Sequence, residues 1–295
     1  NIELAYIPEN LRLGIAWKRF MHPAMLVIGT QKQTTYRKIL NLYKKIKTPK
    51  IWVNIRTAEM VKHAINAFLA TSISFANEMG NLSEMAGVDF NVVAKILKKD
   101  ERIGYFARIN PGLGFSGGTL ARDLRILQEL GQKYKTETTL INSVLTVNEW
   151  QKKWVVRKLK RIFNNTLKDK TVSILGLTYT PQTSTLRRSL SLETINDLVN
   201  SGAKVRGYDL KADRKELAKQ KNFQLAESFE SLVKDSDALV LMTEWNDFLK
   251  LEWPKAAKMM RRAIVLDPKN FLNSLNLAKM GYIYMGIGRG NDETV

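Results

Sequence analysis

Residues 171–209 read TVSILGLTYTPQTSTLRRSLSLETINDLVNSGAKVRGYD and alternate between two kinds of pattern. Short apolar runs bounded by turn residues are typical of buried strands, and the amphipathic run between them is typical of a helix closed by Gly202. The predicted elements here and further along are a strand 171–177, a helix 190–200, and strands 204–208, 237–242 and 263–266. Strands that alternate with helices predict a parallel α/β sheet.

The first 165 residues carry mostly helical spacing. The longest helical pattern, residues 57–86, is apolar on nearly every side, which is typical of a helix buried in a helical core or a subunit interface. The other predicted elements are strands 4–7 and 24–28, helices 34–46 and 88–98, and one long helix 138–163. Asn164-Asn165 ends this last helix and marks a predicted domain boundary.

Composition excludes several classes of protein. Of the 295 residues, 44% are hydrophobic and 25% charged, values that exclude wholesale disorder. The absence of cysteine excludes disulfides, thiolate zinc sites, iron–sulfur clusters and a cysteine nucleophile. The two histidines, His22 and His63, lack suitably spaced partners, so we expect no metal. No apolar run is long enough for a membrane span and no signal peptide is visible, so we expect a cytoplasmic protein without a membrane partner.

The net charge of +19 comes from 47 basic and 28 acidic residues. Residues 1–56 contain eleven basic and two acidic residues, and residues 152–170 contain eight basic residues and one acidic residue. Such clusters fit either a polyanion-binding face or a solvated lysine-rich surface. We favour the solvated surface and expect no nucleic-acid partner, because no nucleic-acid-binding motif accompanies the charge.

Three constellations could carry chemistry. Lys62 and Asn66 share one face of the apolar helix, where a buried ammonium would suit proton handling and a first-turn lysine could instead extend to water. The glycine-rich loop 112–118 precedes a helix and could either cradle an anion or serve close packing. The turn at Gly176, with Asp209 after the next strand, imitates a nucleotide-binding unit but lacks the G-x-G-x-x-G series of a dinucleotide site.

Five groups of motifs follow one another along the chain. They are Pro8-Glu9-Asn10-Leu11-Arg12-Leu13-Gly14; Ala58-Glu59-x-x-Lys62-x-x-x-Asn66-Ala67-Phe68 with Ser74-Phe75-x-Asn77-Glu78; Arg102-Ile103-Gly104 with Gly112-x-Gly114-Phe115-x-Gly117 and Arg122-Asp123; Leu175-Gly176-Leu177-x-Tyr179-x-Pro181-x-Thr183 with Leu186-Arg187-x-Ser189; and Tyr208-Asp209 with Thr243-Glu244-Trp245. Their order and spacing resemble those of the UDP-glucose/GDP-mannose dehydrogenases over nearly the whole chain.

The resemblance implies an activity and an architecture. Members of this family oxidise the C6 hydroxymethyl group of a UDP- or GDP-sugar to a carboxylate, with NAD as cofactor. The implied fold is α/β, with residues 1–50 as the tail of an N-terminal Rossmann domain that binds NAD. Residues 51–165 would form a helical central domain that makes a homodimer, and residues 166–295 a C-terminal Rossmann-like domain that binds the UDP-sugar.

The resemblance also implies residue roles. Lys62 and Asn66 would line the sugar and stabilise developing oxyanions, Asp123 would work with Lys62 on the first proton abstraction, and Glu9 would activate water for the final hydrolysis. Arg102 would reach the sugar site of a neighbouring subunit. In full, the implied catalytic residues are Glu9, Lys62, Asn66, Thr119 and Asp123; the substrate-binding residues are Asn10, Leu11, Arg12, Arg102, Gly114, Phe115, Gly117 and Lys269; and the cofactor-binding residues are Arg122 and Arg187.

The sequence departs from the family pattern in three ways. The NAD-binding half would precede residue 1, so we expect a piece of a longer dehydrogenase that is inactive towards NAD by itself. Thr119 stands in the place of the catalytic cysteine, and a hydroxyl without an adjacent base cannot replace a thiolate. Thr180 and Lys269 replace a lysine and an arginine, and a lysine cannot reproduce a bidentate arginine contact.

Three functions stay open on this basis. In order of preference, they are an NAD-dependent 6-dehydrogenase of a UDP-sugar such as UDP-glucose, a nucleotide-sugar-binding protein without turnover, and a basic nucleic-acid-associated protein. Only the charge of +19 supports the third.

Overall fold

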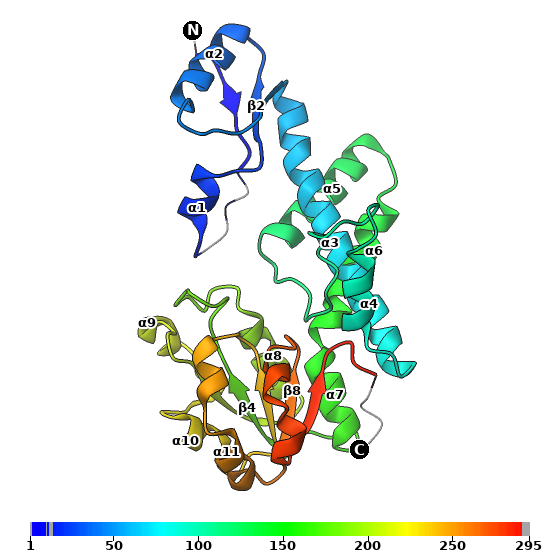
Figure 1. Ribbon diagram of the computed structural model, residues 1–295, viewed down its shortest axis with the longest axis vertical. Coiled ribbons are helices and arrows are strands. Elements are labelled where there is room, and N and C mark those ends of the chain that lie inside the picture. Colours follow the sequence, from blue (N-terminus) through cyan, green and yellow to red (C-terminus); the bar gives the residue numbers. More distant parts are fainter. Residues whose placement is uncertain (1, 10, 12–13, 291–295) are drawn as a thin grey trace. The chain divides into compact units, whose positions relative to one another are not determined.

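The computed structural model describes residues 2–9, 11 and 14–290 (Figure 1). It divides into two compact units, Asn1–Leu69 with Arg122–Thr138, and Ala70–Ala121 with Thr139–Val295. Two helices contribute residues to both units: α3 (Ile55–Met85) and α5 (Thr119–Tyr134). The helix expected at 57–86 is therefore confirmed.

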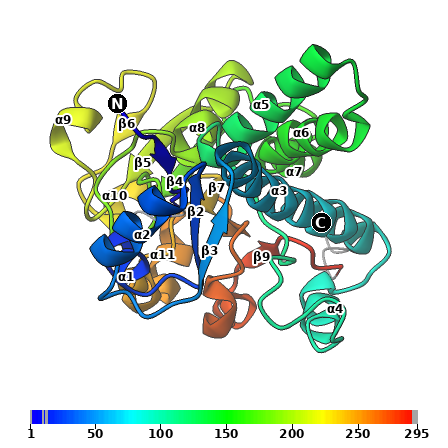
Figure 2. The ribbon, with the colours of Figure 1, turned by 90° about the horizontal axis from the view of Figure 1, so that it is seen from above.

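The first unit is built on a three-stranded sheet of order β1-β2-β3. β1 (Ala5–Tyr6) is antiparallel to β2 (Leu26–Thr30), and β2 is parallel to β3 (Lys50–Val53), which leads directly into α3 (Figure 2). Every residue of β2 is buried, as its apolar run predicts. Gly29 is required there, because a Cβ atom at this position would lie 2.6 Å from Cβ of Ala58 on α3.

Two short helices complete this part of the chain, α1 (Ala16–Met21) and α2 (Gln33–Leu42). The expected helix 34–46 is too long at its end, because Tyr43 leaves the helical conformation and residues 43–46 form turns. β3 was not expected from the sequence. Its residues do not alternate between apolar and polar, and all of its side chains are partly buried or exposed.

In the second unit, α4 (Phe90–Leu97), α6 (Thr139–Lys152) and α7 (Trp154–Ile162) accompany the C-terminal half of α3. The prediction of one unbroken helix over 138–163 is wrong at Lys153, which lies outside helical geometry with φ −87° and ψ 8°. Arg157 stabilises the break. Its guanidinium stacks 3.3 Å from the ring centre of Trp150 and donates to the Trp150 carbonyl group. Burial lowers the pKa of Arg157 to about 10.

The C-terminal part of the second unit is a six-stranded sheet of order β6-β5-β4-β7-β8-β9, parallel throughout, which confirms the parallel α/β prediction. Strand order reverses between β4 and β7, the kind of position beside which open α/β sheets bind ligands. The elements are β4 (Thr171–Leu175), α8 (Leu190–Asn200), β5 (Lys204–Tyr208), α9 (Arg214–Leu217), β6 (Gln224–Leu225), α10 (Phe229–Val233), β7 (Ala238–Leu241), η1 (Asn246–Lys250), α11 (Trp253–Met259), β8 (Ile264–Asp267), η2 (Leu272–Leu275), η3 (Leu277–Met280) and β9 (Ile283–Gly286).

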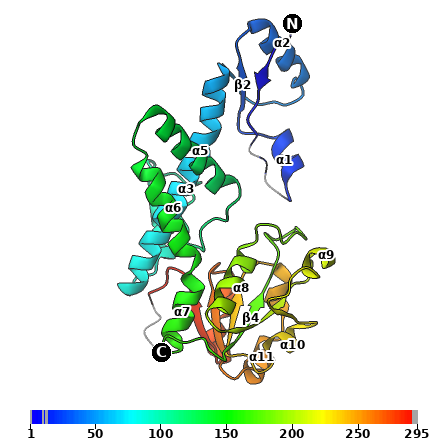
Figure 3. The same ribbon diagram turned by 180° about the vertical axis from the view of Figure 1, so that it is seen from behind.

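Helices cover both faces of this sheet (Figures 1 and 3). On one face, α7 and α8 pack against alternate strand residues such as Ile174 and Val240. On the other face, α10 and α11 pack against the residues in between, such as Leu175 and Leu241. Because successive side chains of a strand point to opposite faces, the unbroken apolar runs in the sequence reflect burial on both sides.

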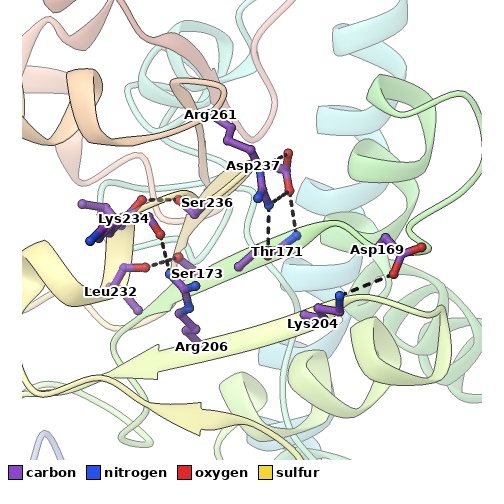
Figure 4. Close-up of polar contacts among 11 residues, drawn as sticks. Asp169, Thr171, Ser173, Lys204, Arg206, Leu232, Lys234, Ser236, Asp237 and Arg261 are labelled. Carbon is purple, nitrogen blue, oxygen red and sulfur yellow. Dashed lines mark hydrogen bonds and ion pairs between the residues drawn. The ribbon is translucent and has the colours of Figure 1, made fainter.

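Polar contacts fix the amino ends of β4 and β7 (Figure 4). Asp237, immediately before β7, accepts a 2.7 Å hydrogen bond from the backbone of Thr171 and pairs with Arg261 at 2.6 Å. Ser173 is one of two buried polar residues of β4, and its hydroxyl donates to the carbonyl group of Leu232 at 2.7 Å, which anchors α10. These contacts do not involve the carboxyl ends of the strands.

Candidate active site

A buried polar cluster forms between α3 and α5 in the first unit. Asn66 donates from Nδ2 to Oδ2 of Asp123, and the side chains of both residues are buried. Arg122 contacts the other carboxylate oxygen, with its Nε atom 3.3 Å from Oδ1. A carboxylate that is only 1% exposed needs such partners, because an isolated buried charge costs several kcal/mol. The structure thus brings together two of the residues expected to be catalytic.

His63 lies beside the same carboxylate, with Nδ1 3.7 Å from Oδ2 of Asp123. This distance exceeds a hydrogen bond, and Nδ1 has no hydrogen-bond partner among the described residues. The pKa of Tyr6 on β1 is also affected by this carboxylate. Burial raises the pKa, and the negative charges of Glu59 and Asp123 raise it further.

The other residues expected to be catalytic in this unit lie outside this hydrogen-bonded cluster. Lys62 is half-buried one turn before Asn66, and Glu9 is exposed in the segment after β1. None of the described residues forms an ion pair or hydrogen bond with either side chain. Leu11 is exposed, and Asn10 and Arg12 lie outside the described residues.

In the second unit, three amide side chains hold the glycine-rich loop. Asn148 of α6 makes two hydrogen bonds to the backbone of Phe115, accepting from its N–H at 2.8 Å and donating to its carbonyl group at 2.9 Å. Gly112 donates to Oδ1 of Asn77 on α3 at 2.8 Å and accepts from Nε2 of Gln151 at 2.8 Å. The loop is therefore fixed at two points before α5 begins.

Sequence reasoning missed the roles of Asn148 and Gln151. They stand three positions apart and share one face of α6, so their spacing could have signalled a polar contact. Both are completely buried, which shows that the contact is internal.

The loop glycines differ in whether a residue with a side chain could replace them. Gly114 has φ +81°, and a Cβ atom there would overlap Oδ1 of Asn148, so only glycine fits. A Cβ atom at Gly117 would meet nothing within 4 Å. Thr119 is exposed as the first residue of α5, and no described residue hydrogen-bonds to its hydroxyl. The structure therefore provides no base beside it.

Arg102 lies at the surface after α4. Its side chain is 88% exposed and pairs with Asp100 through hydrogen bonds of 2.9 and 2.7 Å. These hydrogen bonds lower the pKa of Asp100. Tyr105 and Phe106 nearby in sequence are also strongly exposed. Within the described residues, Arg102 forms no hydrogen bond or ion pair with the glycine-rich loop.

Lys269 lies at the carboxyl end of the large sheet, after β8. Its Nζ atom is 3.5 Å from Oε2 of Glu244, which follows β7. Asp267, the last residue of β8, accepts hydrogen bonds from the backbone of Lys269 and Leu272. Burial raises the pKa of Asp267 despite these hydrogen bonds. A cation and its counter-ion therefore occupy this edge, near the reversal of strand order.

The turn after β4 does not fit a dinucleotide. Asp209, the acidic residue in the ribose-binding position, accepts from the backbone of Leu177 and Thr178 at 2.7 and 3.0 Å. Gly176 serves close packing, because a Cβ atom there would lie 2.6 Å from Thr243. Of the residues expected to bind NAD, Arg187 is exposed and Arg122 pairs with Asp123.

No group of three histidine, aspartate or glutamate side chains in the described ranges is arranged to hold a metal ion. In that part of the chain, no helix combines the length and hydropathy needed to cross a bilayer.

Comparisons with known proteins agree with this architecture. Residues 56–150 match the central domain of the UDP-glucose/GDP-mannose dehydrogenase family, and residues 173–274 match its UDP binding domain. The chain is 34% identical to YtcA of Bacillus subtilis over 284 residues, covering 96% of this chain and 66% of that protein. It is 30% identical to the UDP-glucose 6-dehydrogenase of Rickettsia bellii over 294 residues, covering 98% of this chain and 67% of that protein.

Solved structures show the same relationship. A UDP-glucose dehydrogenase from Pyrobaculum islandicum matches with a TM-score of 0.87 and 30% identity, over 97% of this chain and 64% of that one. The UDP-D-ManNAc dehydrogenase of Pyrococcus horikoshii gives a TM-score of 0.82 and 26% identity, over 98% and 65%. This chain thus spans about two thirds of the length of its relatives.

The helical region and the parallel sheet of this chain together place its fold in the class of nucleotide-sugar dehydrogenases. The chain belongs to the UDP-glucose/GDP-mannose dehydrogenase family.

Proposed function

We propose that this chain is the central and sugar-nucleotide-binding part of an NAD-dependent dehydrogenase that oxidises the C6 hydroxyl group of a UDP-sugar such as UDP-glucose. The buried hydrogen bond between Asn66 and Asp123 carries the proposal, because it joins two polar residues on helices that match the family's central domain. The proposed domains are residues 1–50, 51–165 and 166–295. We also propose a cytoplasmic location for the protein.

The residues of this chain would handle protons and bind the sugar nucleotide. Lys62, half-buried and without a partner among the described residues, would accept the proton of the C6 hydroxyl group together with Asp123. Asn66 would hold Asp123 and stabilise negative charge on the sugar oxygen. Glu9 would activate the water for any hydrolytic step.

Sugar-nucleotide binding is assigned to four further parts of the chain. The backbone of Gly114, Phe115 and Gly117 would bind the ligand, as would residues 10–12. Lys269 would contact it beside Glu244, and Arg102 would act on a neighbouring subunit from its exposed position. NAD would accept hydride in the complete protein, with Arg122 and Arg187 as the contacts expected from this chain.

Thr119 limits the proposed reaction. Oxidation of an alcohol to an aldehyde needs no sulfur, whereas the usual second oxidation passes through a covalent thiohemiacetal. No described residue hydrogen-bonds to the Thr119 hydroxyl, so none of them is in position to activate it as a base. The same observation favours the second candidate function, a protein that binds nucleotide sugars without turnover.

Calorimetric titration of this chain with UDP-glucose, UDP and NAD tests the proposal. We expect saturable binding of UDP-glucose and UDP and no binding of NAD. Failure to bind any nucleotide sugar would contradict both candidate functions. In the complete protein, formation of NADH with UDP-glucose would support the dehydrogenase, and binding without NADH would support the second candidate.

We also propose a homodimer through α3. Phe68, Phe75 and Leu82 follow one another at intervals of seven along this helix and are 73%, 48% and 60% exposed. Large apolar side chains at heptad spacing are typical of a helix that packs against another helix. Sedimentation velocity should show a dimer, and Leu82→Glu should shift it towards monomer. A wild-type monomer at high concentration would contradict the proposal.

A further inference from the structure

The backbone of the glycine-rich loop is held by side chains that are completely buried. Asn77, Asn148 and Gln151 are each 0% exposed, so none of them can itself touch a ligand from solvent. All three direct hydrogen bonds to the backbone at Gly112 or Phe115. In the loop, these amides bind backbone groups, which means that they determine where the loop lies.

The three amides do not contribute equally. Asn148 supplies both a donor and an acceptor to Phe115 and thereby fixes the orientation of its peptide groups. Gln151 supplies a donor to Gly112 and is itself oriented by Asn81, whose Nδ2 atom donates to its Oε1 atom at 2.8 Å. Asn77 contributes one bond, and its Nδ2 atom has no partner within the described residues.

Asn77, Asn148 and Gln151 together form an amide clamp on the loop. After this clamp, backbone N–H donors of the loop remain available. Among the described residues, none accepts a hydrogen bond from the backbone N–H groups of Ser116, Gly117 or Gly118. These groups immediately precede α5, a helix of 16 residues. Their positions follow from that of Phe115, because only a few bonds separate them from it.

We propose that Asn148, assisted by Gln151 and Asn77, is a positioning residue for sugar-nucleotide binding: it fixes Phe115 so that the following N–H groups are preorganised for the ligand. This rests on the proposed function of the loop. Fixing donors before the ligand arrives removes an ordering cost from binding. Loss of the clamp therefore weakens binding without removing any group that touches the ligand.

Two variants and one matched control test this role in the present chain. Asn148→Ala removes both bonds to Phe115, and Gln151→Met removes the donor to Gly112 with little change in side-chain length. Ser74→Ala is the control, because the Ser74 hydroxyl is buried between the same helices and donates to the carbonyl group of Val144 at 3.1 Å. It stabilises the helix pair without touching the loop.

Amide hydrogen exchange reports on the clamp itself, and calorimetry with UDP-glucose reports on its consequence. In Asn148→Ala, exchange at the Phe115 amide should accelerate by about tenfold or more, and UDP-glucose binding should weaken by about tenfold. Gln151→Met should accelerate exchange around Gly112 and weaken binding less. Ser74→Ala should lower the melting temperature about as much as Asn148→Ala does. Amide exchange at Phe115 and UDP-glucose binding should both stay near wild type.

The outcomes separate this proposal from the one on which it rests. Unchanged exchange at Phe115 in Asn148→Ala would overturn the clamp. Accelerated exchange with unchanged UDP-glucose binding would overturn its positioning role, as would equal weakening of binding in Ser74→Ala. If the wild-type chain binds no nucleotide sugar, the proposed function fails and the positioning role fails with it, whereas the exchange data still decide whether the clamp exists.

Discussion

Asn66 and Asp123 lie 57 positions apart in the sequence, and the amide of Asn66 donates directly to the carboxylate of Asp123. Both side chains are buried. The pair joins α3 to α5 and gives the carboxylate a neutral donor instead of a second charge.

A second carboxylate at this position should therefore destabilise the fold. Asn66→Asp replaces the donor by a like charge, and we expect a loss of about 3 kcal/mol in the free energy of unfolding at pH 7. Urea unfolding at pH 7 measures this. Asn246→Asp, at an exposed position, should change stability by less than about 0.5 kcal/mol, and an equal effect of both variants would refute the interpretation.

The glycine-rich loop should tolerate a methyl group at one glycine and reject it at another. Gly114→Ala forces a side chain into a left-handed conformation against Asn148, so the free energy of unfolding should fall by about 2 kcal/mol. Gly117→Ala should cost less than about 1 kcal/mol, since it meets open space. Thermal and urea unfolding of the two variants compare them, and similar losses would show that Gly114 is not specially constrained.

The chain contains no cysteine, so Thr119→Cys introduces a unique thiol at the start of α5. A helix N-terminus stabilises a thiolate, and we expect alkylation to be half-maximal below about pH 8.5, the value for a free cysteine. The pH dependence of iodoacetamide labelling measures this. Thr146→Cys, an exposed position in the middle of α6, provides the comparison, and equal profiles for the two thiols would argue against activation at Thr119.

If the complete protein oxidises UDP-glucose only to the aldehyde, the same substitution should increase the yield of NADH. Thr119→Cys restores the nucleophile for the second oxidation, so the ratio should rise from about one NADH per sugar towards about two. The ratio at complete conversion is measured by absorbance. A wild-type ratio already near two would show that the second oxidation does not need this sulfur.

Acid should weaken the contact between Asp237 and Arg261. Burial alone would raise the pKa of Asp237, but hydrogen bonds from Arg261 and the Thr171 backbone outweigh it and lower this pKa overall. The unfolded chain then binds more protons than the folded one as pH falls through this range. The contact therefore contributes stability above about pH 4, the pKa of an unfolded aspartate, and loses it as pH falls through the lower folded pKa.

Asp237→Asn should accordingly be less stable than wild type at pH 6, with the difference closing below about pH 4. Urea unfolding across this pH range measures the difference. Asp169→Asn is the control, because Asp169 pairs with Lys204 at 3.4 Å with both side chains more than 70% exposed, and such pairs contribute little. A difference for Asp237→Asn that does not vary with pH would contradict the assigned sign.

Much of the C-terminal sheet could be predicted from the sequence, for a local reason. Residues 190–200 and 204–208 were expected as helix and strand and have those bounds in the structure, because Ser201-Gly202 ends one element sharply before the next. Strands buried on both faces leave unbroken apolar runs that are easily recognised. β6 has only two exposed residues, and β9 follows turns with little apolar pattern, so neither was expected.

Local spacing also fails where one particular side-chain contact decides the conformation. No helix breaker marks Lys153 in the sequence, and the break there is stabilised when Arg157 stacks on Trp150 and satisfies its carbonyl group. Such a contact depends on side-chain geometry that spacing does not specify.

The sequence by itself determined the family, the parallel α/β sheet, the long central helix and the substitution at Thr119. Each of these depends only on the local spacing of residues or on the identity of one residue. Tertiary structure decided which of the polar residues meet. Only folding places Asn66 against Asp123, turns Asp209 into a backbone acceptor and buries Asn148 under Phe115. Each of these contacts joins segments more than 30 positions apart, and a buried polar group takes its partner from whatever the packing of helices and strands brings within hydrogen-bond distance.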